Sequence, residues 1–210
     1  MKPEFSFGDF EHLSGAEYFA AIYGTERDKN NCYFFYKTGA CRHGSLCYRA
    51  HNTPSFSRMV ILRNFYVNPV FSADNVKNFL HASNSERDKA EKCHFHEVCK
   101  ELVRELMRRY GIVDDLIVID NVSEHLIGNV YVRFMREEDA AKAVKGLNDR
   151  WFNGQPIYAE LSPEDIFSAR CKDQKINGCT RGAMCNFLHI RWMSRDFRQR
   201  LGLKVDKWEC

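Results

Sequence analysis

Residues 32–51 read CYFFYKTGACRHGSLCYRAH, and this stretch decides what kind of fold the chain can adopt. Cys32, Cys41, Cys47 and His51 are spaced C-x8-C-x5-C-x3-H, with aromatic and basic residues between them and no acid. Three thiolates and one imidazole fill the four positions of a tetrahedral zinc shell, which is the composition of a structural zinc site. Because so short a segment buries little apolar surface, we expect metal binding to supply much of its folding free energy.

A second stretch, CKDQKINGCTRGAMCNFLH at residues 171–189, repeats this pattern with the spacing C-x7-C-x5-C-x3-H. Its candidate ligands are Cys171, Cys179, Cys185 and His189. The repeat predicts two structural zinc ions per chain. A disulfide framework is disfavoured by the two histidines, and a catalytic Cys–His pair is disfavoured because each histidine belongs to a closed set of four ligands.

The spacing resembles that of the CCCH zinc-finger family, whose members mostly bind single-stranded RNA. Aromatic rings beside basic side chains would stack bases and neutralise phosphates. Packing around the metal or against a neighbouring domain is the alternative for any single ring. The predicted RNA-binding residues of the two fingers are Phe34, Tyr36, Arg42, Tyr48, Arg49, Lys172, Arg181 and Phe187.

The region between the two cysteine-rich stretches predicts a fold of the α+β class. Apolar and branched runs indicate strands, and apolar residues at helical spacing indicate two helices, the first of which stops at Gly111. The order βαββαβ implies a four-stranded sheet backed by two helices, flanked by the two small zinc fingers. The predicted strands cover 58–66, 112–120, 126–134 and 155–161, and the predicted helices cover 89–111 and 136–148.

This order resembles the RNA-recognition motif, which stacks bases on aromatic residues of its two central strands. The first fingerprint of that motif places Ile61 where a ring is expected. The second reads IGNVYVRF at 127–134, where Asn129 replaces a ring and only Tyr131 remains of the three platform positions. We therefore expect RNA binding to belong to the fingers and not to the central sheet.

Two features of the central region suggest a protein partner. Arg150, Trp151 and Phe152 lie in the polar stretch NDRWFNG, where a large exposed aromatic is unusual unless a partner covers it. Carboxylates recur at Glu97, Glu101 and Glu105 along one face of the longer predicted helix, an arrangement that favours a cationic partner. The alternative for Trp151 is a side chain folded back onto its own domain. The alternative for the glutamates is a solvated helix face, since a lysine or arginine follows each of them three residues later.

An Arg-x-Phe loop beside an acidic helix resembles the U2AF-homology type of RNA-recognition fold, which captures a tryptophan of a basic peptide. The arrangement of finger, homology domain and finger, with the segments YGTERDKNNC, NVYVRF and NDRWFNGQPIYAELSP, resembles the small subunit of the U2 snRNP auxiliary factor over roughly residues 17–200. The resemblance implies a nuclear pre-mRNA splicing factor that pairs with the large subunit and reads the AG dinucleotide at the 3′ splice site. The Arg/Ser-rich tail frequent in this family is not seen, so recruitment through such a tail is not expected.

The 210 residues divide into five predicted regions, given at the end of this paragraph. The formal net charge is +3, and the N-terminal stretch predicts no secretory signal, so an intracellular protein outside any membrane is expected. No motif for catalysis or for a small-molecule substrate is found, so an enzyme is not expected. The remaining alternatives are an RNA-stability factor with tandem CCCH fingers and a protein-interaction module whose fingers are structural struts. The regions are an N-terminal extension at 1–27, the first finger at 28–54, the central domain at 55–165 with a possible short helix at 73–80, the second finger at 166–192 and a basic tail or helix at 193–210.

Overall fold

The computed structural model describes residues 30–69, 83–164, 166–176 and 178–204. The predicted N-terminal extension at 1–27 and the predicted short helix at 73–80 lie outside these residues, as does the end of the tail after residue 204. Within the described residues, no helix is both long enough and apolar enough to cross a membrane.

The central domain has the predicted βαββαβ order, which confirms the α+β fold. Strands and helices follow one another in the predicted order, and each observed element falls within or overlaps its predicted range. The elements are β1 Met59–Leu62, α4 Asn84–Arg109, β2 Val113–Ile119, β3 Val130–Phe134, α5 Glu137–Leu147 and β6 Ala159–Ser162.

The sheet is antiparallel and has the strand order β6-β1-β3-β2-β7. Strand β7, Ile190–Arg191, directly follows the second cysteine-rich stretch and forms the edge of the sheet, where it pairs with β2 through Ile119 and Ile190. The sequence predicted only four strands. Since the fifth contains two residues, no period-2 pattern could reveal it.

The long helix α4 begins five residues before its predicted start at 89, because Ser83 and Glu86 form a capping box. The Ser83 side chain accepts a hydrogen bond from the backbone N–H of Glu86, and the Glu86 carboxylate accepts from the backbone N–H of Ser83. The helix buries a stripe that includes Phe95, Leu102 and Leu106 against the sheet.

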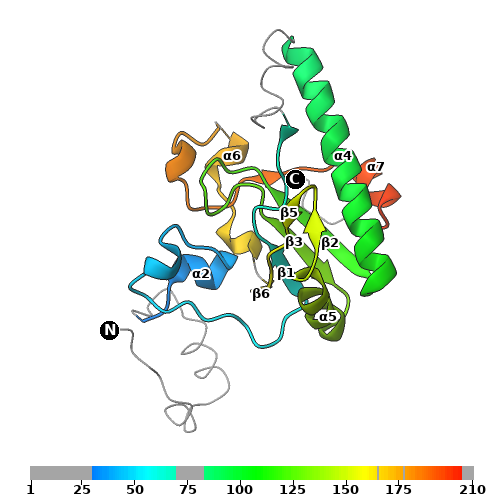
Figure 1. The fold of residues 1–210 in the computed structure, drawn as a ribbon. Helices are drawn as coiled ribbons and strands as arrows, with labels where there is room; N and C mark the ends of the chain where they lie inside the picture. Colours follow the sequence, from blue (N-terminus) through cyan, green and yellow to red (C-terminus); the bar gives the residue numbers. More distant parts are fainter. Residues whose placement is uncertain (1–29, 70–82, 165, 177, 205–210) are drawn as a thin grey trace.

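One face of the sheet packs on helices α4, α5 and α7, Arg195–Arg200 (Figure 1). Helix α7 is held there by the ring of Phe197, which stacks on His96 with centroids 3.9 Å apart. Arg198 Nη2 also donates to Asp115 Oδ1 at 2.5 Å, an ion pair that ties α7 to the edge of β2. The segment after the second finger is therefore part of the domain's core.

The two fingers cover the opposite face of the sheet, so the molecule has three layers (Figure 1). The first finger contains α2, Tyr33–Thr38, and the short helix η2, Gly44–Leu46. The second contains η4, Ile166–Ala169, α6, Asp173–Ile176, and η5, Gly182–Met184. A single apolar cluster joins the fingers to the sheet, and its buried members include Ala40, Ile61, Ile119, Tyr131, Leu188 and Ile190.

Tyr131 lies at the centre of this contact and is fully buried. Its hydroxyl donates to the backbone carbonyl of Thr38, the last residue of α2, at 2.5 Å. Burial raises the pKa of Tyr131, so the hydroxyl stays protonated and remains a donor. Beside it, Arg63 Nη2 donates to the carbonyl of Gly39 at 2.7 Å and to Glu160 Oε2 at 2.6 Å. The one remaining platform ring therefore holds the first finger to the sheet.

We predict that Tyr131→Phe lowers the free energy of unfolding by about 1–3 kcal/mol, because it leaves the buried Thr38 carbonyl without this donor. Urea unfolding of the zinc-loaded protein measures the change. Tyr158→Phe is the matched control, since Tyr158 is 60% exposed and its hydroxyl should contribute little. Equal unfolding midpoints for the two variants would contradict this role of the Tyr131 hydroxyl.

Candidate zinc centres, nucleic-acid interface and partner groove

Each predicted ligand set comes together in space. One ligand atom from each residue of a set lies within 4.8 Å of the others, in both fingers. That spacing suits four ligands around one zinc ion, for which Zn–S bonds are about 2.3 Å long. His189 Nε2 is buried and has no hydrogen-bond partner, as expected for a nitrogen that coordinates metal. The two Cys3His groups therefore fit two structural zinc ions, which would cross-link each finger.

The two fingers are copies of one local structure despite their different first intervals. In each, the backbone N–H of the first ligand donates to the carbonyl of the residue before the histidine, at 2.9 Å from Cys32 to Ala50 and 2.9 Å from Cys171 to Leu188. Gly44 and Gly182 open the corresponding short helices with φ of 48° and 49°, a left-handed conformation that favours glycine. The repeat read in the sequence is thus a structural repeat.

The fingers lie side by side, and their aromatic side chains meet. Phe34 and Phe187 have ring centroids 6.2 Å apart in an edge-to-face arrangement. Arg42 of the first finger donates from Nη2 to the carbonyl of Ala183 in the second at 3.1 Å. These contacts make one continuous surface from two sequence segments that are far apart in the chain.

Arg181 donates a hydrogen bond to one of the candidate zinc ligands of the second finger, a contact that the sequence did not indicate. Its Nη2 donates to Cys171 Sγ at 3.1 Å and pairs with Asp173 Oδ2 at 2.9 Å, while its guanidinium lies 5.6 Å from the centroid of Phe187. The first finger has exposed His43 at the equivalent position. The positive charge of Arg181 therefore compensates thiolate charge in the second finger only.

The other predicted RNA-binding residues are more dispersed. Tyr48 is 83% exposed at the tip of the first finger, and the guanidinium of Arg49 lies 5.5 Å from its ring centroid. Lys172 is exposed on the second finger. Tyr36 follows Phe34 by two residues on α2, about 200° around the helix, so its half-buried ring faces away from the Phe34–Phe187 contact.

The loop between β2 and β3 is hydrogen-bonded to the second finger and lies near charged residues of the first, which the sequence did not indicate. Asn121 Oδ1 accepts from the backbone N–H of His189 at 2.7 Å, and Asn121 Nδ2 donates to the carbonyl of Phe187 at 3.0 Å. Burial lowers the pKa of His125 to about 4, and the charges of Arg42 and His43 act in the same direction. This loop therefore fixes Phe187 relative to the sheet.

Trp151 and Phe152 form a small hairpin and not the polar loop that the sequence suggested. Strand β4, Trp151–Phe152, pairs with β5, Gln155–Pro156, through a two-residue turn in which Asn153 and Gly154 have φ of 47° and 74°. Side chains alternate along a strand, so the two aromatics point in opposite directions. Trp151 is 70% exposed, whereas Phe152 stacks on Phe65 with centroids 4.7 Å apart.

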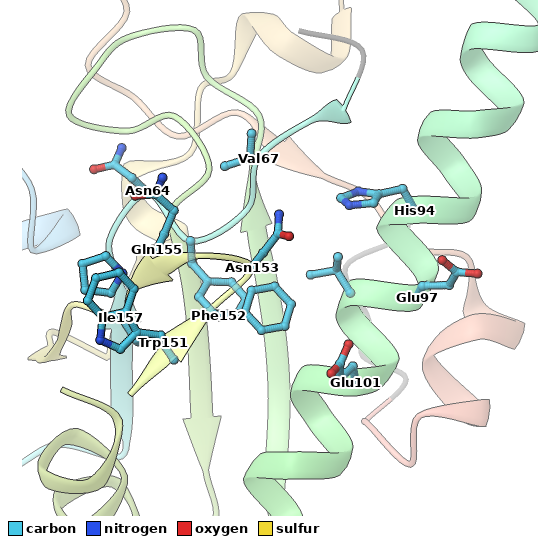
Figure 2. Close-up of a pocket in the computed structure, with 13 residues that line it drawn as sticks. Asn64, Val67, His94, Glu97, Glu101, Trp151, Phe152, Asn153, Gln155 and Ile157 are labelled. Carbon is cyan, nitrogen blue, oxygen red and sulfur yellow. The ribbon is translucent and has the colours of Figure 1, made fainter. Parts of the chain in front are cut away.

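A groove separates this hairpin from α4 (Figure 2). It consists of two adjoining hollows of about 490 and 440 Å³, which share the lining residues Phe65, Glu101, Trp151, Phe152 and Ile157. Figure 2 shows the ring of Phe152 pointing toward α4, with Trp151 on the other side of the hairpin. Phe65, Val67 and His94 are among the groove residues that sequence reasoning missed. Phe65 lies within the predicted strand range 58–66, three residues after β1 ends, and His94 precedes Glu97 by three residues on α4. Both positions could therefore have been associated with the groove from the sequence.

The three predicted glutamates differ in their surroundings. Glu105 pairs with Arg108, Arg109 and Arg150, and the Arg108 hydrogen bond, followed by those of Arg109 and Arg150, lowers its pKa to about 2. Glu105 therefore anchors Arg150 at the start of the hairpin. Glu97 and Glu101 are exposed beside the groove and make no ion pair within the described part of the chain.

Comparison with known proteins agrees with this architecture. A family model described as RNA recognition motif matches residues 95–158, and one described as zinc finger C-x8-C-x5-C-x3-H type matches residues 28–53. The chain is 47% identical to the splicing factor U2AF 26 kDa subunit of Bos taurus over 188 residues, which cover 89% of this chain and 84% of the relative.

The chain belongs to the U2AF small-subunit family of splicing factors. It is also 45% identical to the U2af 38 kDa subunit of Drosophila melanogaster, with 89% of this chain and 70% of that one covered. The U2AF 23 kDa subunit of Schizosaccharomyces pombe is 43% identical, with 92% and 86% covered. Membership in the U2AF small-subunit family, together with the two zinc centres and the RNA-recognition fold, supports a role in splicing.

We predict that Arg181→Ala speeds zinc loss from the second finger, because the Cys171 thiolate loses a charged hydrogen-bond donor. Transfer of zinc to a colour-forming chelator should show two phases, of which only the one assigned to the second finger becomes faster. His43→Ala, at the equivalent position of the first finger, should leave both phases unchanged. Equal release rates for the Arg181→Ala variant and the unmodified protein would contradict the stabilising role.

Proposed function

We propose that this U2AF small-subunit family member is a nuclear pre-mRNA splicing factor that recognises the AG dinucleotide of the 3′ splice site through its two zinc fingers. It forms a heterodimer with the large subunit of the U2 auxiliary factor through its central domain. The proposal extends the splicing role named for its relatives to a specific RNA contact and a specific partner.

The observation that carries the RNA contact is the meeting of Phe34 and Phe187 across the finger junction. RNA bases stack on accessible aromatic rings, and RNA phosphates need basic side chains nearby. Both rings are half-buried and not enclosed, and Arg49, Lys172 and Arg181 lie on the same two fingers. The sheet face that serves ordinary RNA-recognition motifs is occupied by the fingers themselves. Single-stranded RNA would therefore bind on the fingers, across their junction.

The partner contact is supported by the chemistry of the groove. The groove has an aromatic wall of Phe65 and Phe152, and beside it Glu97 and Glu101 have no ion-pair partner among the described residues. This chemistry suits a basic peptide that inserts an aromatic side chain. Trp151 lines both hollows and is largely exposed, so its indole offers a second anchor for the same peptide. A heterodimer interface on this side leaves the finger junction open for RNA.

If the fingers only support the central domain structurally, RNA binding should not depend on their aromatic residues. In that case Phe34 and Phe187 would serve packing alone, and substitutions that preserve the fold would leave RNA binding unchanged. An RNA-stability factor with tandem fingers would bind RNA through the same rings but would not need the groove. Separate tests of the junction and of the groove distinguish the three functions.

We predict that Phe187→Ala weakens binding of a short uridine–AG–guanine RNA by about 5- to 150-fold, because one stacked base is worth roughly 1–3 kcal/mol. Titration of a labelled oligonucleotide at fixed salt with the zinc-loaded protein measures the loss. Phe187→Tyr retains a ring and should keep most of the affinity. Circular dichroism and zinc content confirm that each variant is folded.

Tyr158→Ala is the control for this measurement, since Tyr158 is 60% exposed and lies beside the sheet edge β6, away from the junction. It should bind RNA as the unmodified protein does. If folded Phe187→Ala keeps full affinity, the strut hypothesis replaces the proposed RNA contact. If a scrambled RNA binds equally well, recognition of AG is refuted.

We predict that Trp151→Ala weakens binding of the large subunit by about 30-fold or more, since truncating a buried aromatic anchor commonly costs about 2–4 kcal/mol. Glu101→Lys should weaken it less, and that loss should shrink as salt is raised because exposed charges are screened. Isothermal calorimetry measures both.

Asp149→Lys, which makes the same kind of charge change at an exposed position outside the two hollows, is the matched control for Glu101→Lys and should leave the affinity near that of the unmodified protein. Unchanged calorimetric affinity for Trp151→Ala would mean that the indole is not an anchor.

A further inference from the structure

Trp192 is a large aromatic residue that the predicted functions do not use. It is 40% exposed and directly follows β7 at the edge of the sheet. The guanidinium of Arg170 lies 5.9 Å from its ring centroid. Arg170 directly precedes Cys171, the first ligand of the second finger, so the pair sits at the base of that finger.

The side of the sheet on which Trp192 lies follows from its strand. Ile190 packs in the apolar cluster beneath the fingers, whereas Arg191 points to the other face, with its guanidinium 4.5 Å from the centroid of Phe95 on α4. Because side chains alternate along a strand, Trp192 returns to the finger side. Its contact with Arg170 agrees with this placement.

Two side-chain contacts and one short backbone segment link Trp192 and Arg170 to Phe187 at the finger junction. Phe187 lies beneath Arg181, which pairs with Asp173 at 2.9 Å. Asp173 and Arg170 are separated by three positions of one segment, a span of about 10 Å at most. Trp192 therefore lies close enough to Phe187 for a single RNA strand to contact both side chains within a few nucleotides.

The charge of this surface favours a nucleic acid. Arg170 and exposed Lys172 are basic, and the one nearby acid of the connecting segment, Asp173, is already paired with Arg181. An aromatic face combined with basic side chains is the composition that holds single-stranded nucleic acid without strict sequence preference. A protein partner would more often require a broader apolar patch around such a tryptophan.

We propose that Trp192, Arg170 and Lys172 form an additional RNA subsite on the second finger, which stacks one base that flanks the AG-containing core and neutralises its phosphates. The subsite rests on the proposed function, since it extends the same RNA strand beyond Phe187. It contributes affinity for longer RNA, and the core sequence is read elsewhere.

The test compares a short uridine–AG–guanine RNA with the same RNA lengthened by four uridines at its 5′ end, at its 3′ end or at both. The zinc-loaded full chain should bind one of the longer RNAs about five-fold or more tightly than the short one. Trp192→Ala should remove that gain and leave binding of the short RNA unchanged. Trp192→Phe should retain most of the gain, and Arg170→Ala should reduce the salt dependence of binding to the longer RNA.

Tyr158→Ala, at the opposite edge of the sheet, should keep the full gain. The subsite is refuted if lengthening the RNA gives no gain, or if Trp192→Ala keeps the gain, as a protein-binding role for this surface would predict. Loss of short and long RNA to the same degree by Trp192→Ala would also refute it, because Trp192 would then only support the finger. Failure of the unmodified protein to bind even the short RNA would instead refute the proposed function.

Discussion

The rest of this structure depends on the burial of one sheet face beneath two metal-linked fingers. The face carries Ile61, Ile119 and Tyr131, which would be exposed on the central domain alone. The fingers are too small to bury much apolar surface by themselves, and the first has only a small cluster around Phe35 and its zinc ligands. Zinc would therefore close each finger, and the sheet gives both an apolar surface to pack on. The hydrogen bond from the Tyr131 hydroxyl to the Thr38 carbonyl fixes the orientation of the first finger on the sheet, because apolar packing by itself is non-directional.

This packing explains why the finger residues and the groove residues belong to different surfaces. The fingers cover the face that binds RNA in ordinary RNA-recognition motifs, and Phe34 and Phe187 meet where the two fingers adjoin. The groove is formed instead by α4 and the hairpin at Trp151, next to the helical layer. The proposed RNA contact and the proposed partner contact therefore lie on different surfaces, and they share no side chain among those assigned to them.

The sequence predicted most of the fold and the metal ligands, because these are encoded in short local patterns. Ligand spacing and hydrophobic periodicity needed no knowledge of distant contacts. The interpretation of charged residues was less complete. Glu105 is held by three arginines and Arg181 is held by a thiolate, and in each case the decisive contact is a side-chain geometry that residue spacing does not report. The fifth strand was missed because β7 is formed by pairing with β2 and has almost no pattern of its own.

The sequence by itself determined the two Cys3His sets, the βαββαβ order and the exposure of Trp151, since each follows from residue type and spacing within one segment. Only the tertiary structure decided that the fingers lie side by side on the sheet, that Phe34 meets Phe187 and that Trp192 reaches Arg170. The physical reason is that these contacts join residues far apart in the chain. Their positions depend on how an apolar sheet face and two zinc-closed loops bury each other, which no single segment encodes.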